Sequence, residues 1–274
     1  MLIKKREVVE LSENIRKAID GQKVDFRVNR EGAWGILKND IHTLVSLKSE
    51  QAESFHLERD FMADSLANIS HQLKTPLTSM MIMADLLENA PAEKQGEFIA
   101  NIKIGLTRME WLVSALLKMS KLDTGAVEFS MKSISSSQLL DIALEPLQIL
   151  LDVKNQCVEI SNDIELVCDK RWTAEALTNI LKNASEYSPE NSKIYVDCGM
   201  NPICKWISVT DSGEGIPKEK IAGIFRRFEG SRSDKGYGVG LPLALAILRG
   251  QNGDIEVNVG EQGSGAIFTM KFFK

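Results

Sequence analysis

The sequence predicts an α+β protein: an antiparallel helical hairpin that pairs with a second copy into a dimeric four-helix bundle, followed by a two-layer α/β sandwich. Residues 1 to about 125 contain few glycines and prolines, whereas β-type runs, glycines and turn signals appear from about residue 126 onward. Strands joined by short turns, with helices collected between them, are typical of such a sandwich. The predicted domains are a helical linker (1–60), a dimerisation hairpin (61–125) and the sandwich (126–274).

Composition and charge describe a folded protein without a broad basic face. The 274 residues include 33 Lys and Arg against 38 Asp and Glu, for a formal net charge of −5. This charge excludes a nucleic-acid role driven by phosphate neutralisation. The four cysteines form no C-x-x-C pair and have no histidine at ligand spacing, so we expect reduced thiols of a cytoplasmic protein rather than a metal site or disulfides.

The N-terminal residues suggest where the chain stands relative to a membrane. No apolar run approaches the roughly 18 residues of a membrane span, and no signal peptide is recognisable. The opening "MLIKKR" is typical of the basic collar just inside a membrane. One hypothesis is therefore that this chain is the cytoplasmic portion of a membrane protein whose spanning segments lie upstream; the alternative is an ordinary charged N-terminus.

The linker is predicted to hold two helices, at residues 7–20 and 36–60, separated by "DGQKVDFRVNREGAWG". These could form a signal-transmitting module, parallel in the dimer, whose second helix runs on into the next domain. The alternative is a disordered leader.

The hairpin is predicted from two apolar stripes with steps of three and four residues. The segment "NAPAEKQ" (89–95) separates them. Because one hairpin cannot enclose both stripes, we expect a homodimer. The first stripe is Met62, Leu66, Ile69, Leu73, Leu77, Met80, Ala84 and Leu87, and the second is Phe98, Ile102, Gly105, Met109, Leu112, Leu116 and Met119.

A histidine lies in the middle of the first hairpin helix, in "SHQLKTPLTS". His71 is two residues past Ile69, about 200° around the helix, so it points away from the apolar stripe and should be exposed. Pro76 removes the amide that would bond the carbonyl of Gln72, and so bends the helix nearby. By itself, this pattern also fits a surface histidine beside a tolerated kink.

The second half of the chain should contain seven strands and helices collected between them, with a ligand site between the helices and the glycine loops. The predicted strands are 127–134, 156–161, 165–169, 193–199, 205–211, 253–259 and 266–273, with a helix at 137–153, 171–187, 217–224 and 240–250.

Asn179 and Asn183 form the first candidate site in this half. They are four residues apart and so share one helix face. Amide oxygens suit Mg²⁺, which keeps phosphate oxygens and waters in its coordination shell. Two asparagines alone are also common as polar surface or cap residues.

Asp211 and the glycines after it form the second candidate site, "DSGEGIP". Asp211 ends an apolar strand, and Gly213 and Gly215 permit a close approach by a flat ring whose exocyclic amine donates to the carboxylate. Alone, this is a common turn.

The third candidate site is "GYGVGL", with Gly236, Gly238 and Gly240 before a predicted helix. Unpaired amides at a helix N-terminus can cradle phosphates. A solitary G-x-G-x-G is weak evidence, and this one does not follow a strand as a Rossmann fingerprint requires.

Taken together and in order, these motifs resemble those of the sensor histidine kinases of two-component signalling. The resemblance covers about residues 60–274, and the linker before it is only weakly similar to HAMP-type modules. The matching motifs are the H box (His71, Lys74, Thr75, Pro76), the N box (Asn179, Asn183), the first glycine box (Asp211, Gly213, Gly215), the phenylalanine box (Phe225, Phe228) and the second glycine box (Gly236, Gly238, Gly240).

The resemblance implies a Bergerat (GHKL-type) ATP-binding domain and a defined chemistry. Adenine would lie against Asp211, Mg²⁺ would be held through Asn183, and a lid of roughly residues 229–239 would close over the phosphates. His71, an exposed imidazole nucleophile, would accept the γ-phosphoryl group and pass it to an aspartate of a response regulator. Further nucleotide-binding residues implied are Asn179, Tyr187, Arg227, Lys235 and Leu241, with the glycines of both boxes.

The residue after the histidine departs from the family pattern. Relatives usually carry Glu or Asp there to orient the imidazole and accept its proton, and this chain has Gln72. An amide can orient the ring but cannot act as a base, so slow autophosphorylation is expected. Thr75 shares the face of His71, and in relatives a polar residue there positions water to dephosphorylate the regulator.

Three further departures lie in the sandwich. Glu186 replaces a basic residue and should repel the triphosphate unless it is turned away or bridged by metal. The arginine expected after the phenylalanine box is missing, so Arg227, Arg232 or Lys235 would substitute. The common "H-G-G" after the last helix is "GQNGD" here, which should affect only a helix end.

Two alternative functions remain open. Gyrase and mismatch-repair ATPases share the ATP-binding fold but lack the histidine hairpin, so "SHQLKTPL" argues against them. A nucleotide-binding dimeric signalling scaffold, or a phosphatase with weak kinase activity, would be compatible with Gln72 and Glu186.

Overall fold

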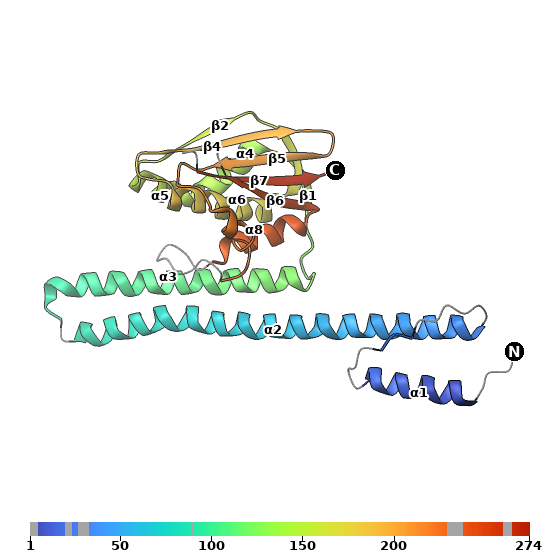
Figure 1. The fold of residues 1–274 in the computed structure, drawn as a ribbon. Helices are drawn as coiled ribbons and strands as arrows, with labels where there is room; N and C mark the ends of the chain where they lie inside the picture. Colours follow the sequence, from blue (N-terminus) through green and yellow to red (C-terminus); the bar gives the residue numbers. More distant parts are fainter. Residues whose placement is uncertain (1–4, 20–23, 27–32, 89, 229–237, 260–264) are drawn as a thin grey trace. The chain divides into compact units, whose positions relative to one another are not determined.

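A computed structural model describes residues 5–19, 24–26, 33–88, 90–228, 238–259 and 265–274, without the side chains of residues 5, 52–65 and 218 (Figure 1). The chain divides into two compact units, residues 1–67 and 68–274. In the described part, no helix combines the length and the apolar character needed to cross a bilayer.

The first unit contains helix α1 (Lys5–Ile19) and the beginning of helix α2 (Ala33–Glu88). Among its described side chains, Leu11 and Phe26 are buried apolar ones. The ring of Phe26 lies 6.4 Å from that of His42, centroid to centroid. The predicted linker helix and the predicted histidine helix are one continuous α2, which confirms that the former runs on into the latter.

The second unit begins with the predicted hairpin, formed by the C-terminal part of α2 and by α3 (Ala92–Asp123). The two helices run antiparallel (Figure 1). Pro91 is the N-cap residue of α3, so the break between the helices is shorter than the predicted segment 89–95. Met80 is buried between the helices, and a Cβ on Gly105 would lie 2.6 Å from its sulfur. A glycine on α3 therefore makes room for the methionine on α2.

A mixed sheet of five strands forms one layer of the sandwich, in the order β2-β4-β5-β7-β6. β2 and β4 are parallel and the other neighbours are antiparallel. Strands β1 (Met131–Ser135) and β3 (Glu165–Asp169) pair separately. The strands of the larger sheet are β2 (Cys157–Ser161), β4 (Lys193–Met200), β5 (Cys204–Thr210), β6 (Gly253–Val259) and β7 (Ala266–Phe273).

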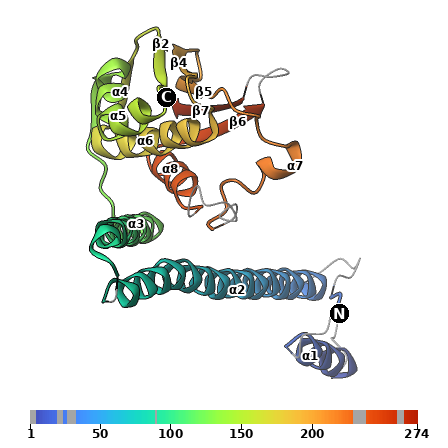
Figure 2. The same ribbon diagram turned by 90° about the vertical axis from the view of Figure 1, so that its left-hand side faces the viewer.

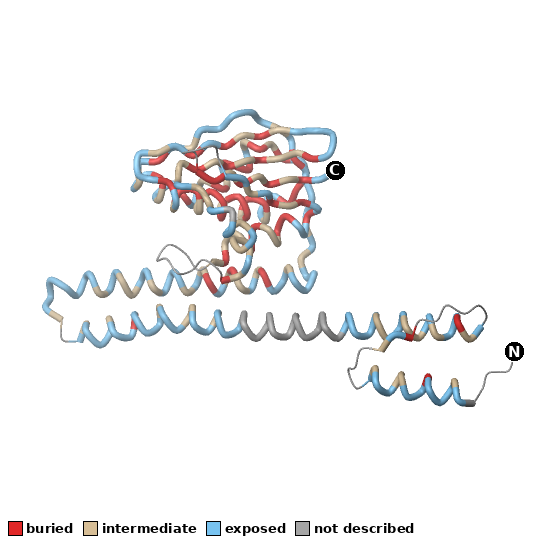
Figure 3. The backbone as a smooth tube through the Cα atoms, in the orientation of Figure 1, coloured by how far each residue is buried: buried red, intermediate tan, exposed pale blue. Residues whose placement is uncertain are grey.

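Helices cover one face of this sheet and form the second layer (Figure 2). The core lies between the layers, where Figure 3 shows the buried segments. Three residues of α3, Leu112, Ala115 and Met119, are buried with this core. The helices after α3 are α4 (Ser136–Leu144), η1 (Glu145–Leu147), α5 (Gln148–Val153), α6 (Lys170–Tyr187), α7 (Lys218–Ile221) and α8 (Gly240–Arg249).

The fold class is confirmed, but three element predictions need correction. The helix predicted at 137–153 is divided into α4, η1 and α5, because Pro146 provides no amide and disfavours a helical conformation before it. The helix predicted at 217–224 is the four-residue α7. The strand predicted at 127–134 starts later, at Met131, and lies outside the main sheet.

The four cysteines are free thiols in the structure. Cys157 is exposed and the other three are buried. Burial raises the pKa of the Cys168 and Cys198 thiols, which disfavours their reactive thiolate form.

Candidate functional site

Helix α6 positions the two asparagines of the first candidate site. It begins at Asp169, whose carboxylate accepts hydrogen bonds from the amides of Arg171 (3.0 Å) and Trp172 (3.1 Å). This N-cap fixes where the helix starts, and therefore which of its faces turns toward the core. Asn179 falls on that buried face, whereas Asn183 is half-buried.

Asn179 joins α6 to the beginning of α8. Its side-chain amide donates to the carbonyl of Glu175 at 3.0 Å. Its Oδ1 lies 3.0 Å from the point that a Cβ on Gly240 would occupy, so this glycine permits the two helices to approach. Asn183, one turn further, makes no side-chain hydrogen bond within the described residues, which leaves its amide oxygen available to a ligand.

The N-terminus of α8 provides the anion-binding feature expected of the second glycine box. Its N-cap residue, Val239, makes no side-chain hydrogen bond to the first turn. The first amides of a helix have no intrahelical partner, and together with the helix dipole they favour phosphate. Gly238 adopts a left-handed conformation (φ 66°) just before this turn, and Leu241 packs against the core from within it.

Asp211 is 4% exposed at the end of β5. Its Oδ1 accepts hydrogen bonds from the amides of Gly213 (2.8 Å) and Ala266 (3.1 Å). Burial raises the pKa of this carboxyl, and the two amides oppose the shift. Both hydrogen bonds from described residues use Oδ1, so Oδ2 is the oxygen that can accept from an exocyclic amine.

The glycines after Asp211 are required by close backbone contacts. A Cβ on Gly213 would lie 2.7 Å from the carbonyl oxygen of Tyr187, at the end of α6. Gly215 adopts φ 78°, a left-handed conformation that L side chains rarely take. Tyr187 itself is exposed. The predicted turn thus lies directly against the helix that carries both asparagines.

Sequence reasoning missed the residues that face Asp211 from the last strand. A Cβ on Gly265 would lie 1.8 Å from Asp211 Oδ1, so only glycine fits there. Its neighbour Ala266 supplies one of the two amides that hold the carboxylate. The small residues of "GSGA" (263–266) were the available signal, although small residues before a strand are common.

The phenylalanine box lies beside the second glycine box. Phe228 is buried with φ 65°, and its amide donates to the carbonyl of Gly238 at 2.9 Å. Phe225 packs against the core. The residues that flank segment 229–237 are therefore hydrogen-bonded to each other. Arg232, Lys235 and Gly236, all named from the sequence, lie outside the described residues.

Glu186, which departs from the family pattern, and Arg227, a candidate substitute for the missing arginine, both have charged partners in the structure. Arg227 forms an ion pair with Asp123 at the end of α3, with a distance of 2.7 Å between nitrogen and oxygen. Glu186 lies 3.8 Å from the Lys182 ammonium, four residues earlier on α6. The carboxylate that was expected to repel phosphate is therefore accompanied by a lysine.

The H-box residues lie on α2. His71 is exposed, as its position relative to Ile69 predicted, and Gln72 is half-buried. The Thr75 hydroxyl donates to the carbonyl of His71 at 3.1 Å. The helix continues through Pro76, and hydroxyl contacts of this kind to the preceding turn are associated with helix bending.

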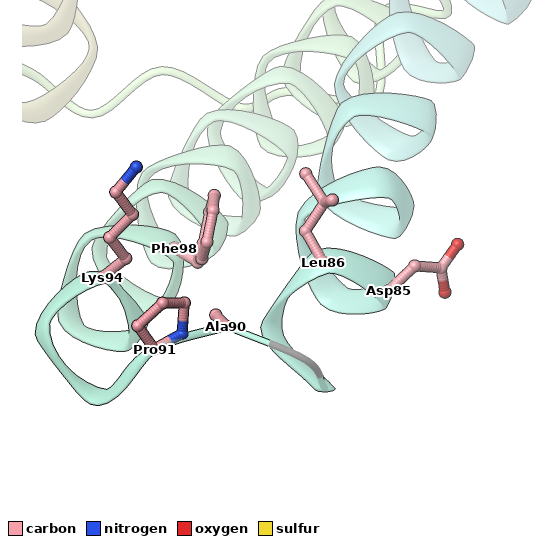
Figure 4. Close-up of a pocket in the computed structure, with 6 residues that line it drawn as sticks. All are labelled: Asp85, Leu86, Ala90, Pro91, Lys94 and Phe98. Atoms are coloured by element: carbon pink, nitrogen blue, oxygen red, sulfur yellow. The ribbon is translucent and has the colours of Figure 1, made fainter.

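Neither of two clefts formed by described residues of the second unit includes Asp211 or the asparagines. One, of about 250 Å³, lies at the turn of the hairpin (Figure 4). The other, of about 490 Å³, includes Arg227 alone among the predicted site residues. The first is lined by Asp85, Leu86, Ala90, Pro91, Lys94 and Phe98.

The donor set of the sandwich fits a nucleotide with a divalent cation. The described residues contain no cluster of three or more His, Cys, Asp or Glu that could hold a metal by itself. Mg²⁺ often takes only one or two protein ligands and completes its shell with phosphate oxygens and water. Asn183 is suitably placed on α6 for this, and Asp211, Gly213 and the first turn of α8 offer matching contacts for a base and for phosphates.

Comparisons with known proteins agree with this site. The family model of the His Kinase A (phospho-acceptor) domain matches residues 61–125. The model of histidine kinase-, DNA gyrase B-, and HSP90-like ATPases matches residues 168–274. Fold and site therefore define a phosphoacceptor hairpin joined to an ATPase-type sandwich.

Two relatives extend the similarity over most of the chain. The adaptive-response sensory kinase SasA of Gloeothece citriformis is 30% identical over 291 residues, which cover 95% of this chain and 72% of SasA. The heme sensor protein HssS of Staphylococcus saprophyticus is 32% identical over 221 residues, 78% of this chain. The chain spans 47% of the length of HssS. This chain belongs to the sensor histidine kinases of two-component systems.

A solved structure shows the same fold. Full-length ShkA, in complex with AMPPNP, matches with a TM-score of 0.57 and 25% identity, covering 76% of this chain and 45% of ShkA.

The burial of Asp211 leads to a prediction with opposite effects on binding and stability. In Asp211→Asn, Oδ1 can still accept both amides, but an NH₂ group replaces the oxygen that the family resemblance implies as the acceptor for adenine. We expect ATP affinity to fall about ten- to hundredfold, the value of a hydrogen bond to a charged group. Isothermal titration with AMPPNP measures this.

The stability of Asp211→Asn should be retained or increased, although its ATP affinity falls. Because the folded-state pKa of Asp211 is raised, its ionisation opposes folding above that pKa, and the effect vanishes below the unfolded-state pKa. Asp211→Asn should therefore unfold at the same or a higher temperature at pH 7.

Asp163 provides the matched control, because hydrogen bonds from Ser136 and Ser137 lower the pKa of its carboxyl. Asp163→Asn should lower the unfolding temperature and leave AMPPNP binding unchanged. Tight binding by Asp211→Asn would contradict the proposed role of this carboxylate.

Proposed function

We propose that this chain is an ATP-dependent protein histidine kinase that phosphorylates itself on His71 and transfers the phosphoryl group to an aspartate of a response regulator. The observation that carries the proposal is the buried Asp211 carboxylate, held by two amides through one oxygen and surrounded by Gly213 and Gly265. An exposed histidine in a phosphoacceptor hairpin accompanies it. The relation to ShkA, which was solved with AMPPNP, supports a nucleotide substrate.

The proposed reaction is a direct phosphoryl transfer. A nitrogen of the His71 imidazole forms a bond to the γ-phosphorus of ATP while the bond from that phosphorus to the β,γ-bridging oxygen breaks, and ADP leaves. Since the Gln72 amide cannot accept the imidazole proton, water or product phosphate takes it. Positioning and charge stabilisation provide most of the rate in such reactions.

Mg²⁺, held through Asn183, would neutralise charge on the phosphates. The uncapped first turn of α8 would donate amides to the phosphates. Asn179, fixed against Gly240, would keep α8 in place relative to Asn183. Arg227 could reach the phosphates only by leaving Asp123, and an exposed ion pair of this kind is worth about 1 kcal/mol or less.

We further propose that the chain acts as a homodimer. Large apolar side chains remain exposed on both hairpin helices, Leu77 and Met81 on α2 and Leu106 and Val113 on α3. A second hairpin would cover such stripes in a four-helix bundle. As a separate proposal, the chain is the cytoplasmic portion of a sensor and is attached upstream to a membrane segment.

Phosphoryl incorporation tests the proposal. The purified chain is incubated with γ-labelled ATP and Mg²⁺, and the label is tested for loss in acid and for transfer to a receiver domain. An acid-labile label that moves to the receiver supports the kinase. No label, despite measurable binding of AMPPNP, overturns the kinase and favours the scaffold or phosphatase to which Gln72 points.

Thr75 is proposed to support phosphatase activity on the regulator. Its hydroxyl donates to the His71 carbonyl, which leaves its lone pairs to orient a water. Thr75→Ala should lower the rate of regulator dephosphorylation while autophosphorylation is retained. Thr78, exposed on the same helix, gives the matched control Thr78→Ala, which should change neither rate. An unchanged dephosphorylation rate in Thr75→Ala removes this role.

A further inference from the structure

Two buried glutamines lie at opposite ends of α6: Gln251, from the "GQNGD" segment, and Gln156, which belongs to none of the motifs described above. Gln156 is 7% exposed and Gln251 is 6% exposed. At the N-terminal end, Gln251 Oε1 accepts from the amide of Asp169 (2.6 Å) and the hydroxyl of Thr173 (3.2 Å), and its amide donates to the carbonyl of Ile247 (3.3 Å). It therefore links the start of α6 to α8.

Gln156 binds the C-terminal end of α6. Its Nε2 lies within hydrogen-bond distance of the carbonyl oxygens of Ser185 (3.2 Å), Ser188 (3.2 Å) and Pro189 (2.9 Å). Its Oε1 accepts from the Ser185 hydroxyl at 2.6 Å. The last carbonyls of a helix have no intrahelical donors. The two N–H groups of this buried amide therefore point to the carbonyls at the end of α6 and just after it, since Ser188 is the C-cap residue and Pro189 follows it.

Lys154 reinforces this attachment from the same turn between α5 and β2. Its ammonium donates to the carbonyls of Ser185 (2.6 Å) and Glu186 (3.4 Å). A positive charge is favourable at the C-terminal end of a helix dipole. Figure 2 shows α5 and α6 on the same face of the sheet. The C-terminal end of α6 is thus hydrogen-bonded to the turn between α5 and β2, which contains Lys154 and Gln156.

The same end of α6 touches the turn that carries Asp211. The Ser188 hydroxyl accepts from the amide of Ser212 at 3.0 Å. The Tyr187 carbonyl lies so close to Gly213 that a Cβ there would approach it to 2.7 Å. Any shift in the end of α6 would therefore displace the turn whose amide at Gly213 holds the Asp211 carboxylate.

We propose that Gln156 is a positioning residue for ATP: it fixes the C-terminal end of α6, and through Ser188 the Asp211 turn, so that Asn183 and Asp211 bind one nucleotide together. The inference rests on the proposed function, because it assigns these two residues to the same ligand. Gln156 does not touch the nucleotide itself.

The two glutamines allow a matched experiment. Gln156→Ala and Gln251→Ala each remove a buried amide with several hydrogen bonds from one end of α6, so both should lower the unfolding temperature by a similar amount. Only Gln156→Ala should weaken AMPPNP binding, by about tenfold, as is typical when a group behind a ligand-binding side chain is removed. In autophosphorylation, the ATP concentration for half-maximal rate should rise in this variant while the rate at saturating ATP is retained.

A smaller change tests the same path if Gln156→Ala does not fold. Ser188→Ala removes only the hydroxyl that accepts from Ser212 and keeps the carbonyl bound by Gln156, so a smaller loss of AMPPNP affinity is expected. Unchanged affinity in both variants, or an equal loss in Gln251→Ala, overturns the inference while the kinase stands. Failure of the wild-type chain to bind AMPPNP overturns the proposed function and the inference with it.

Discussion

The His71→Ala variant should incorporate no acid-labile phosphate from γ-labelled ATP. The imidazole is the only nucleophile that the proposed reaction uses, and alanine offers no nitrogen to form the bond to phosphorus. Because His71 is exposed on α2, its removal should neither unfold the hairpin nor alter the sandwich. AMPPNP affinity is therefore expected to remain at the wild-type value while labelling falls to background.

The other histidines supply the control. The chain contains three, so His42→Ala and His56→Ala remove the same side chain elsewhere. Both variants should still accept acid-labile phosphate. If the label persists in His71→Ala, or disappears in a control variant that still folds, then the assignment of His71 as the phosphoacceptor is wrong.

The Gln72→Glu variant should label faster than wild type, by about 10²- to 10⁴-fold if proton transfer limits the rate, which is the usual contribution of a general base. Gln72 and glutamate have nearly the same shape, so the substitution should preserve the orientation of the neighbouring imidazole. It adds the ability to accept the proton that leaves the imidazole. Rates of label incorporation at saturating ATP measure the effect.

Charge alone could change the rate, and Gln51 distinguishes that possibility. It is exposed on the same helix, so Gln51→Glu adds an equal charge without a base beside His71. We expect this control to label at the wild-type rate. Equal rates for wild type and Gln72→Glu would show that the glutamine does not limit the reaction, and that the slow autophosphorylation expected from the sequence was wrong.

Sequence patterns predicted the elements well where the signal is local. Helical spacing located α2 and α3, and the position of His71 relative to Ile69 predicted its exposure. The strands of the main sheet followed from β-type runs and turn residues. One error has a local cause, because Pro146 divides a predicted helix. The helix predicted at 217–224 is reduced to the short α7 (Lys218–Ile221).

The sequence did not predict the contacts that complete the Asp211 site. Ala266 donates to a carboxylate 55 residues earlier, and the two come together because Thr210 pairs with Ile267 between β5 and β7. Gly265 had no visible reason to be glycine until this pairing placed it against Asp211. Sheet register depends on which strands become neighbours, and spacing along the chain does not specify that.

The sequence by itself determined the order of the helices and strands, the exposed histidine and the residues of each motif, since periodicity and turn chemistry act over a few residues. Only the tertiary structure decided that Asn179 fixes α8 through Gly240, that Arg227 pairs with Asp123, and that Gln156 holds the end of α6. These roles arise from hydrogen bonds and close approaches between distant segments, which exist only after the layers have packed.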